Sequence, residues 1–264
     1  MIELVKKKDL YVVIRVPKCG SSSLSRMFIN AFPKSNHFSV YSAVYDLMNE
    51  DRNKISSIEK FRILKNTYKR NLKNYNRLSF KSVWEKINKS VMSDDIVHGH
   101  FTIDSIKLKN ANKRLITLIR NPYERILSDY NYSRNSYSNK NFSLKKFNKR
   151  LYASKNYSLE GYISYLKENE PMMSRQLSRY LIGKETVSDN LKFMNEHYFA
   201  YGVLDKIDIF IENFYKKTNV RLRNQKVNIT KNKMKVSLSE SEKLVISKFC
   251  EEDIELYNQI KQSI

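Results

Sequence analysis

The chain is poor in the residues that break regular structure or cross-link it. Its 264 residues include only 5 glycines, 4 prolines and 2 cysteines. So few glycines and prolines argue against a loop-rich β-sandwich, whose many tight turns depend on them. Cys19 and Cys250 lie far apart in the sequence, so they predict neither a metal site nor a disulfide framework. Their scarcity favours a reducing cytoplasm.

Long apolar runs are also absent from the sequence. No stretch approaches the roughly 20 apolar residues that a transmembrane helix requires. The N-terminal segment has basic residues and a short apolar run but no small-residue cleavage site, so we expect no signal peptide. Hydrophobic residues nevertheless form 41% of the chain, enough for a sizeable core. We expect a single cytoplasmic domain over residues 1–264.

Acidic residues are scarce relative to basic ones. There are 27 Asp and Glu against 49 Lys and Arg, which gives a formal net charge of +22. This charge predicts a polyanionic partner, for which a nucleic acid, a nucleotide donor, an acidic glycan and an anionic membrane surface are equal candidates. No zinc-finger, helix-turn-helix or RNP pattern supports nucleic-acid binding. A basic nucleic-acid-binding protein therefore remains only as an alternative outside the enzymes.

Short apolar runs alternate with segments of helical periodicity along the chain. The apolar runs predict buried strands over 10–16, 96–98, 115–119 and 198–203. Helical spacing predicts helices within 50–90 and over 24–32, 121–132, 158–168, 172–182, 207–215 and 239–261. Residues 131–156 are polar and favour a loop with some helix. This alternation predicts an α/β fold with a mainly parallel central sheet flanked by helices.

The segment 15–24, RVPKCGSSSL, joins the first predicted strand to a helix and has the features of an anion-binding loop. Gly20 lets the backbone approach an anion closely, and three serines after it offer hydroxyl and N–H donors at a positive helix end. Lys18 adds a mobile point charge. An ordinary strand–helix turn with a solvated Lys18 fits the same pattern. A Walker A loop does not, because its lysine follows the glycines whereas Lys18 precedes Gly20.

The segment 120–130, RNPYERILSDY, begins where the most apolar predicted strand ends. Arg120 is expected at the carboxyl edge of the sheet, where open α/β folds bind ligands. Its Asn-Pro pair suits the N-cap and the first position of a helix. Arg125 and Ser128 share one helix face, so they are expected to converge with Arg120 on a phosphate. A helix start with a surface arginine pair fits the segment equally well.

Together the strings PKCGSSS at 17–23 and RNPYERILSDY at 120–130 resemble the two nucleotide-binding motifs of sulfotransferases that use 3′-phosphoadenosine 5′-phosphosulfate (PAPS). The resemblance implies a P-loop-like sulfotransferase fold with helical additions, PAPS as donor and PAP as product. It also implies that Arg120 and Ser128 hold the 3′-phosphate. By the same resemblance, the 5′-phosphosulfate is held by Lys18, Cys19, Gly20, Ser21, Ser22 and Ser23.

Further strings resemble the heparan sulfate 2-O-sulfotransferase branch of that family. They are RVPK, which adds Arg15 to the donor-binding residues, VHGHF at 97–101 and NEHYFAYGV at 195–203. The branch implies transfer to a carbohydrate hydroxyl, and the basic charge of the chain would suit an acidic glycan. A small molecule, a lipid or a tyrosine is the alternative acceptor. Eukaryotic members are membrane-anchored Golgi proteins; without such an anchor in the sequence, we expect a bacterial or viral cytoplasmic enzyme.

The resemblance also assigns the chemistry. His100, the second histidine of the His-Gly-His string, is expected to be the general base, since a neutral imidazole accepts a hydroxyl proton well. His98 is expected to orient it or to bind the acceptor, and Lys18 to stabilise the leaving oxygen. Packing in the core is the alternative role for the histidine pair. Thr230 and Lys233 resemble a loop that closes over the nucleotide, and no metal is expected.

Overall fold

A five-stranded parallel sheet forms the centre of the computed structural model, which describes residues 8–41, 80–139, 149–183, 189–225 and 237–264. Its strands lie in the order β2-β3-β1-β4-β5, and every pairing is parallel. They are β1 (Lys8–Ile14), β2 (His37–Tyr41), β3 (Ile96–His100), β4 (Ala111–Ile119) and β5 (Tyr198–Val203). The predicted α/β fold class is confirmed.

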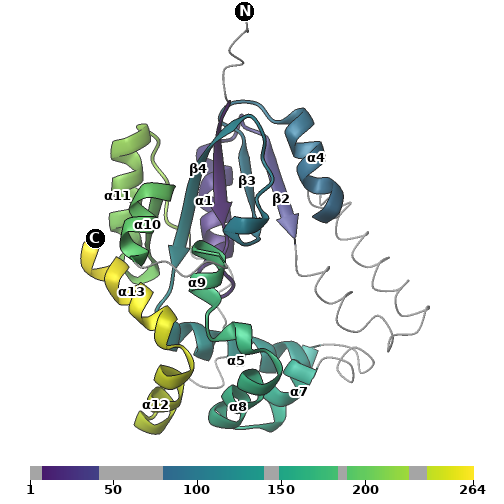
Figure 1. Ribbon diagram of the computed structural model, residues 1–264, viewed down its shortest axis with the longest axis vertical. Helices are drawn as coiled ribbons and strands as arrows, with labels where there is room; N and C mark the ends of the chain where they lie inside the picture. The colour runs from purple at the N-terminus through teal and green to yellow at the C-terminus, as the bar shows by residue number, and fades with distance from the viewer. Residues whose placement is uncertain (1–7, 42–79, 140–148, 184–188, 226–236) are drawn as a thin grey trace, which may run out of the picture.

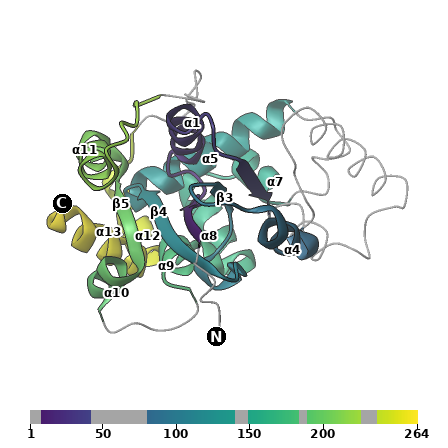
Figure 2. The ribbon, with the colours of Figure 1, turned by 90° about the horizontal axis from the view of Figure 1, so that it is seen from above.

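Helices cover both faces of this sheet (Figure 2). One face is covered by α1 (Ser21–Ala31) and α11 (Ile207–Thr218). The other is covered by α4 (Phe80–Ser90), α9 (Gln176–Leu181), α10 (Asn190–His197) and α13 (Glu251–Ser263). No helix in the described ranges is long and apolar enough to cross a membrane.

The central strand β1 shows why the sheet is covered on both sides. Val12 and Ile14 point into one hydrophobic cluster, whereas Tyr11 and Val13 point into the other. All four are at most 3% exposed. A continuous apolar run is what a strand buried on two faces requires, because its side chains alternate between them.

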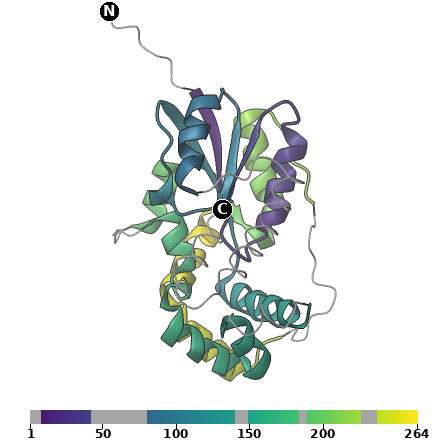
Figure 3. The same ribbon diagram turned by 90° about the vertical axis from the view of Figure 1, so that its right-hand side faces the viewer.

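A further group of helices lies beyond the carboxyl ends of the strands (Figures 1 and 3). It consists of α5 (Pro122–Asn139), α7 (Lys149–Asn156), α8 (Leu159–Asn169) and α12 (Glu240–Phe249). These helices share a separate hydrophobic cluster around Ile126, Tyr162 and Ile246. They therefore lie next to the edge of the sheet where ligands bind in open α/β folds, and these four helices are called the floor of helices below.

Several element boundaries differ from the sequence-based expectation. Helix α1 begins at Ser21 and not at residue 24, and β2 was not expected at all. The segment 131–156 contains the end of α5 and all of α7, because packing of these helices outweighs their weak helix propensity. The expected helix over 239–261 is two helices, α12 and α13, that meet at Cys250. A capping box between Ser239 and Glu242 starts the first of them.

Candidate active site

The strand order brings three separate parts of the sequence to one edge of the sheet. The strand β1 lies between β3 and β4, with Ile14 paired to Gly99 on one side and Thr117 on the other. The residues that follow each pairing, including His100 and Arg120, therefore emerge at the same edge. After β1 the chain forms β2 and β3 on one side of it and then crosses to β4 on the other side, so this edge is a topological switch point, the usual place for a ligand crevice.

The loop after β1 is shaped by two residues with left-handed backbone conformations. Lys18 has φ 66° and Gly20 has φ 70°. Gly20 is also the N-cap of α1, and a Cβ atom on it would lie 2.8 Å from the Cδ1 atom of Leu204. Glycine meets both demands, since it has no side chain and tolerates positive φ. The serines 21–23 then form the first turn of α1, whose N–H groups point toward the loop.

Lys18 is a desolvated cation at the mouth of this loop. Burial lowers the pKa of its ammonium group to about 8, although the carboxylate of Asp129 acts in the opposite direction. Its Nζ atom lies 3.7 Å from the centre of the Tyr132 ring. Such a poorly hydrated charge is well suited to neutralise an incoming anion.

The side chain of Cys19 is buried beneath the loop. The residue is 1% exposed and belongs to the main hydrophobic cluster, and its N–H group donates to the carbonyl of Val16. Burial also raises the pKa of its thiol to about 12. The side chain of Cys19 therefore fills the core beneath the loop, so the predicted contact with the donor would fall to its backbone.

Arg120 and Ser128 lie at the start of α5 and along it, below the end of β4. The side chain of Arg120 is 25% exposed, and its guanidinium pairs with Glu124 at 3.0 Å. Ser128 is half-buried two turns into the helix. The Oδ1 atom of Asn121 accepts from the Tyr123 N–H at 2.9 Å, as expected of the helix cap. The structure thus leaves Arg120 accessible at the sheet edge.

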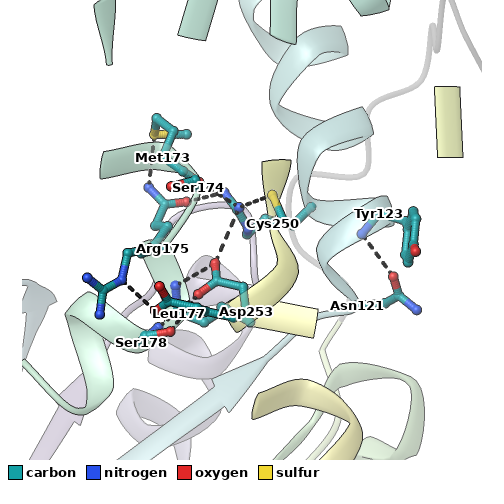
Figure 4. A network of polar contacts seen from close by, with 12 residues as sticks. Asn121, Tyr123, Met173, Ser174, Arg175, Leu177, Ser178, Cys250 and Asp253 are labelled. Carbon is teal, nitrogen blue, oxygen red and sulfur yellow. Dashed lines mark hydrogen bonds and ion pairs between the residues drawn. The ribbon is translucent and has the colours of Figure 1, made fainter. Parts of the chain in front are cut away.

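Arg125 does not converge with Arg120, contrary to the sequence-based expectation. Its side chain is fully buried in the floor of helices, where it donates to Gln176 Oε1 at 2.7 Å and to the Met173 carbonyl at 2.9 Å. It also lies 3.5 Å from the carboxylate of Asp253. Figure 4 shows this network around Asp253 and Cys250, which joins α5, α9 and α13. Arg125 therefore supports the fold and does not face the site.

His100 ends β3 and is hydrogen-bonded to Arg15, which follows β1 and leads into the loop. Its Nδ1 atom lies 2.6 Å from the carbonyl oxygen of Arg15, so Nδ1 carries the proton and donates it. In the neutral ring the lone pair then resides on Nε2. Burial, followed by the charges of Arg15 and Lys18, lowers the pKa of His100 to about 4. The structure therefore favours the unprotonated ring that a general base requires.

The other two residues of the His-Gly-His string contact neighbouring elements of the fold. His98 is 7% exposed, and its Nδ1 atom lies 3.3 Å from the hydroxyl of Ser25 in α1. Gly99 cannot be replaced without movement, because a Cβ atom there would lie 1.9 Å from the carbonyl oxygen of Val40. Thus His98 contacts α1, and Gly99 allows β2 to approach β3; a role of His98 beside His100 stays a prediction. Arg15 is likewise mostly buried, with 7% exposure.

Two expected site residues, Thr230 and Lys233, fall outside the described residues.

The sequence analysis did not assign a role to Asp129, which lies close to Lys18. The carboxylate of Asp129 is buried behind Lys18, and it accepts from Arg150 and from the hydroxyl of Tyr162. Asp129 follows Ser128 in the 120–130 string, and that position was the only available signal. Among the described residues, no cluster of His, Cys, Asp or Glu suits a metal ion.

Comparisons with known proteins show the family to which the chain belongs. A family model described as a sulfotransferase domain matches residues 8–182. No curated protein sequence matches the chain. Among solved structures, the crystal structure of mouse sulfotransferase SULT7A1 complexed with PAP matches with 12% sequence identity and a TM-score of 0.34. That match covers 94% of this chain and 66% of the mouse chain, so this chain spans less than two thirds of it. Because the family model covers more than half of its residues, the chain belongs to the sulfotransferase family.

Proposed function

We propose that the protein is a PAPS-dependent sulfotransferase that transfers a sulfuryl group to a carbohydrate hydroxyl, with His100 as the general base. The observation that carries this proposal is the hydrogen bond from His100 Nδ1 to the Arg15 carbonyl. It orients the imidazole beside the strand that continues into the Lys18 loop, and burial, which lowers the pKa of His100, keeps the ring neutral. A proton acceptor and an anion-binding loop thus share one edge of the sheet.

The donor would be held at its two charged ends by different strand ends. Lys18, the glycine turn and the first turn of α1 provide a cation and backbone donors for the 5′-phosphosulfate. Arg120 and Ser128 are proposed to bind the 3′-phosphate from the end of β4 and from α5. Lys18 and Arg120 already affect each other electrostatically, since the charge of Arg120 lowers the pKa of Lys18. A ligand phosphate or sulfate would relieve this repulsion.

In the proposed reaction the acceptor oxygen attacks the sulfur of PAPS, and the bond from sulfur to the bridging oxygen breaks. His100 Nε2 takes the hydroxyl proton, and PAP leaves with the electron pair of the broken bond. Lys18 stabilises the negative charge that develops on the bridging oxygen. Positioning and electrostatics carry such transfers, as they do in phosphoryl transfer. The lowered pKa of His100 keeps the ring ready to accept the proton.

A carbohydrate acceptor is supported by the strings that this chain shares with the 2-O-sulfotransferase branch. His98, Gly99 and His100 form one of these strings, and the 195–203 string covers the end of α10 and β5. The formal charge of +22 would attract an acidic glycan to the site. The bacterial or viral origin and the cytoplasmic location remain predictions.

Two measurements test this proposal. The first is the melting temperature with and without PAP, which should rise clearly, since ligand at about 100 times its dissociation constant adds roughly 2.7 kcal/mol. The second incubates the protein with radiolabelled PAPS and a panel of glycans, and mass spectrometry locates the transferred group. Arg120→Ala should remove most of the PAP effect, whereas Arg175→Ala, an exposed arginine paired with Glu252, should not. An unchanged melting temperature at millimolar PAP would refute the donor assignment.

A further inference from the structure

The ring of Tyr132 is exposed on the surface of helix α5, beside the donor loop. Asp129, Tyr130, Asn131 and Ser133 are each at most 4% exposed. Tyr132 lies among them and is 55% exposed. Its neighbours already anchor this part of the helix, so the ring contributes little burial to the fold. Its position calls for a different explanation.

The ring of Tyr132 contacts the ammonium group of Lys18. The 3.7 Å between Nζ and the ring centre is well inside the roughly 6 Å range of a cation–π interaction. Lys18 has a left-handed backbone conformation in the loop, with φ 66°, which sets the direction of its Cα–Cβ bond. Tyr132 belongs to α5, one helical turn beyond Ser128. The contact thus joins the loop after β1 to the helix after β4.

Burial and the surrounding charged groups shift the pKa of Lys18 in opposite directions. Burial is the largest influence and disfavours the ammonium form, which brings the pKa to about 8. The negative face of an aromatic ring favours the ammonium form. The pKa of the Cys19 thiol is raised to about 12 and that of His100 is lowered to about 4, so both groups are neutral near pH 7. The charges that act on Lys18 are those of Asp129 from α5, Arg120 from the end of β4 and Arg150 from α7.

We propose that Tyr132 is a positioning residue for Lys18. The ring of Tyr132 holds the ammonium group of Lys18 in its charged form at the open side of the donor loop. The inference rests on the proposed function, because it concerns the lysine that is proposed to meet the transferred sulfuryl group. It adds a residue that acts on catalysis through Lys18 and makes no bond to the donor. The ring face, and not the phenolic hydroxyl, carries the effect.

The test compares Tyr132→Leu with Tyr132→Phe across pH. Leucine keeps an apolar cover over Lys18 but removes the π face, so the ammonium form loses about 1 kcal/mol, or about 0.7 units of pKa. From the starting pKa of about 8, kcat/KM for PAPS in Tyr132→Leu should fall about threefold at pH 8 and stay nearly unchanged at pH 6.5. Tyr132→Phe keeps the ring and should behave as the wild type at both values. Tyr152→Leu, at a tyrosine of similar exposure (52%) on α7, is the matched control.

The possible outcomes separate the inference from the proposed function. Equal kcat/KM of the wild type and Tyr132→Leu at pH 8 would overturn the inference, and so would an equal loss at both pH values. A loss in Tyr132→Phe as large as in Tyr132→Leu would overturn it too, since the hydroxyl would then carry the effect. If PAP does not change the melting temperature of the wild type, the proposed function itself is overturned, and the inference with it.

Discussion

The two arginines of the RNPYER string should respond to substitution in opposite ways. Arg120 is accessible at the sheet edge, whereas the side chain of Arg125 is fully buried among α5, α9 and α13. We therefore predict that Arg125→Ala destabilises the fold, while Arg120→Ala removes PAP binding with little change in stability. Arg175→Ala serves as the control, because its partner Glu252 is also exposed.

The size of the effect at Arg125 follows from what its removal leaves behind. Gln176, the Met173 carbonyl and the Asp253 carboxylate would each lose a buried donor. Removing one partner of a buried ionic network costs about 3–5 kcal/mol, whereas an exposed pair is worth about 0–1 kcal/mol. At about 2–4 °C per kcal/mol, the melting temperature of Arg125→Ala should fall by about 10 °C. For Arg120→Ala, a change of at most about 4 °C is expected.

Thermal unfolding followed by circular dichroism, with and without PAP, measures both effects in one experiment. Arg125→Ala should melt early and still gain stability from PAP at temperatures where it is folded. Arg120→Ala should melt near the wild type and gain little from PAP. A normally stable Arg125→Ala that no longer responds to PAP would refute this reasoning, since Arg125 would then be a ligand residue and not a core residue.

Three further variants test other parts of the site. His100→Ala should lower turnover about 100-fold while PAP still raises the melting temperature; wild-type turnover in this variant would place the base elsewhere. Since the pKa of His100 is lowered to about 4, this base should stay unprotonated well below pH 6, and a wild-type kcat/KM that already falls by half near pH 6.5 would contradict that. Lys18→Ala should reduce turnover more than PAP affinity, measured by kinetics and calorimetry, and equal losses would make Lys18 a binding residue only. Gly99→Ala should unfold at markedly lower denaturant concentration, because its Cβ atom would meet the Val40 carbonyl at 1.9 Å, and an unchanged midpoint would show that β2 can shift.

The local features of the site were readable from the sequence because they depend on neighbouring residues. The apolar run of β1, the glycine turn and the small polar residues after it specify a strand, a loop and a helix start without reference to the rest of the chain. The Asn-Pro pair likewise marks the start of α5, and Asn121 makes the expected cap contact. Even so, α1 begins earlier than its apolar periodicity suggested, since Gly20 and not an apolar residue sets its start.

The roles of individual side chains were harder to predict where two residues share a motif. Arg120 and Arg125 are both arginines of one string, yet α9 and α13 bury only the second. His98 and His100 both lie on β3, yet Ser25 of α1 contacts one and the Arg15 carbonyl the other. These partners are far away in the sequence. No local sequence pattern predicts these contacts.

The sequence by itself therefore determined the class of the fold, the two anion-binding segments and the family resemblance, because each depends on short-range patterns of size, charge and hydrophobicity. The tertiary structure alone decided which of these residues face the site. Strand order placed the ends of β1, β3 and β4 side by side, and long-range packing buried Cys19 and Arg125. It also brought Tyr132 to within 3.7 Å of Lys18. Burial and long-range contacts arise only when distant segments meet, so no stretch of sequence contains them alone.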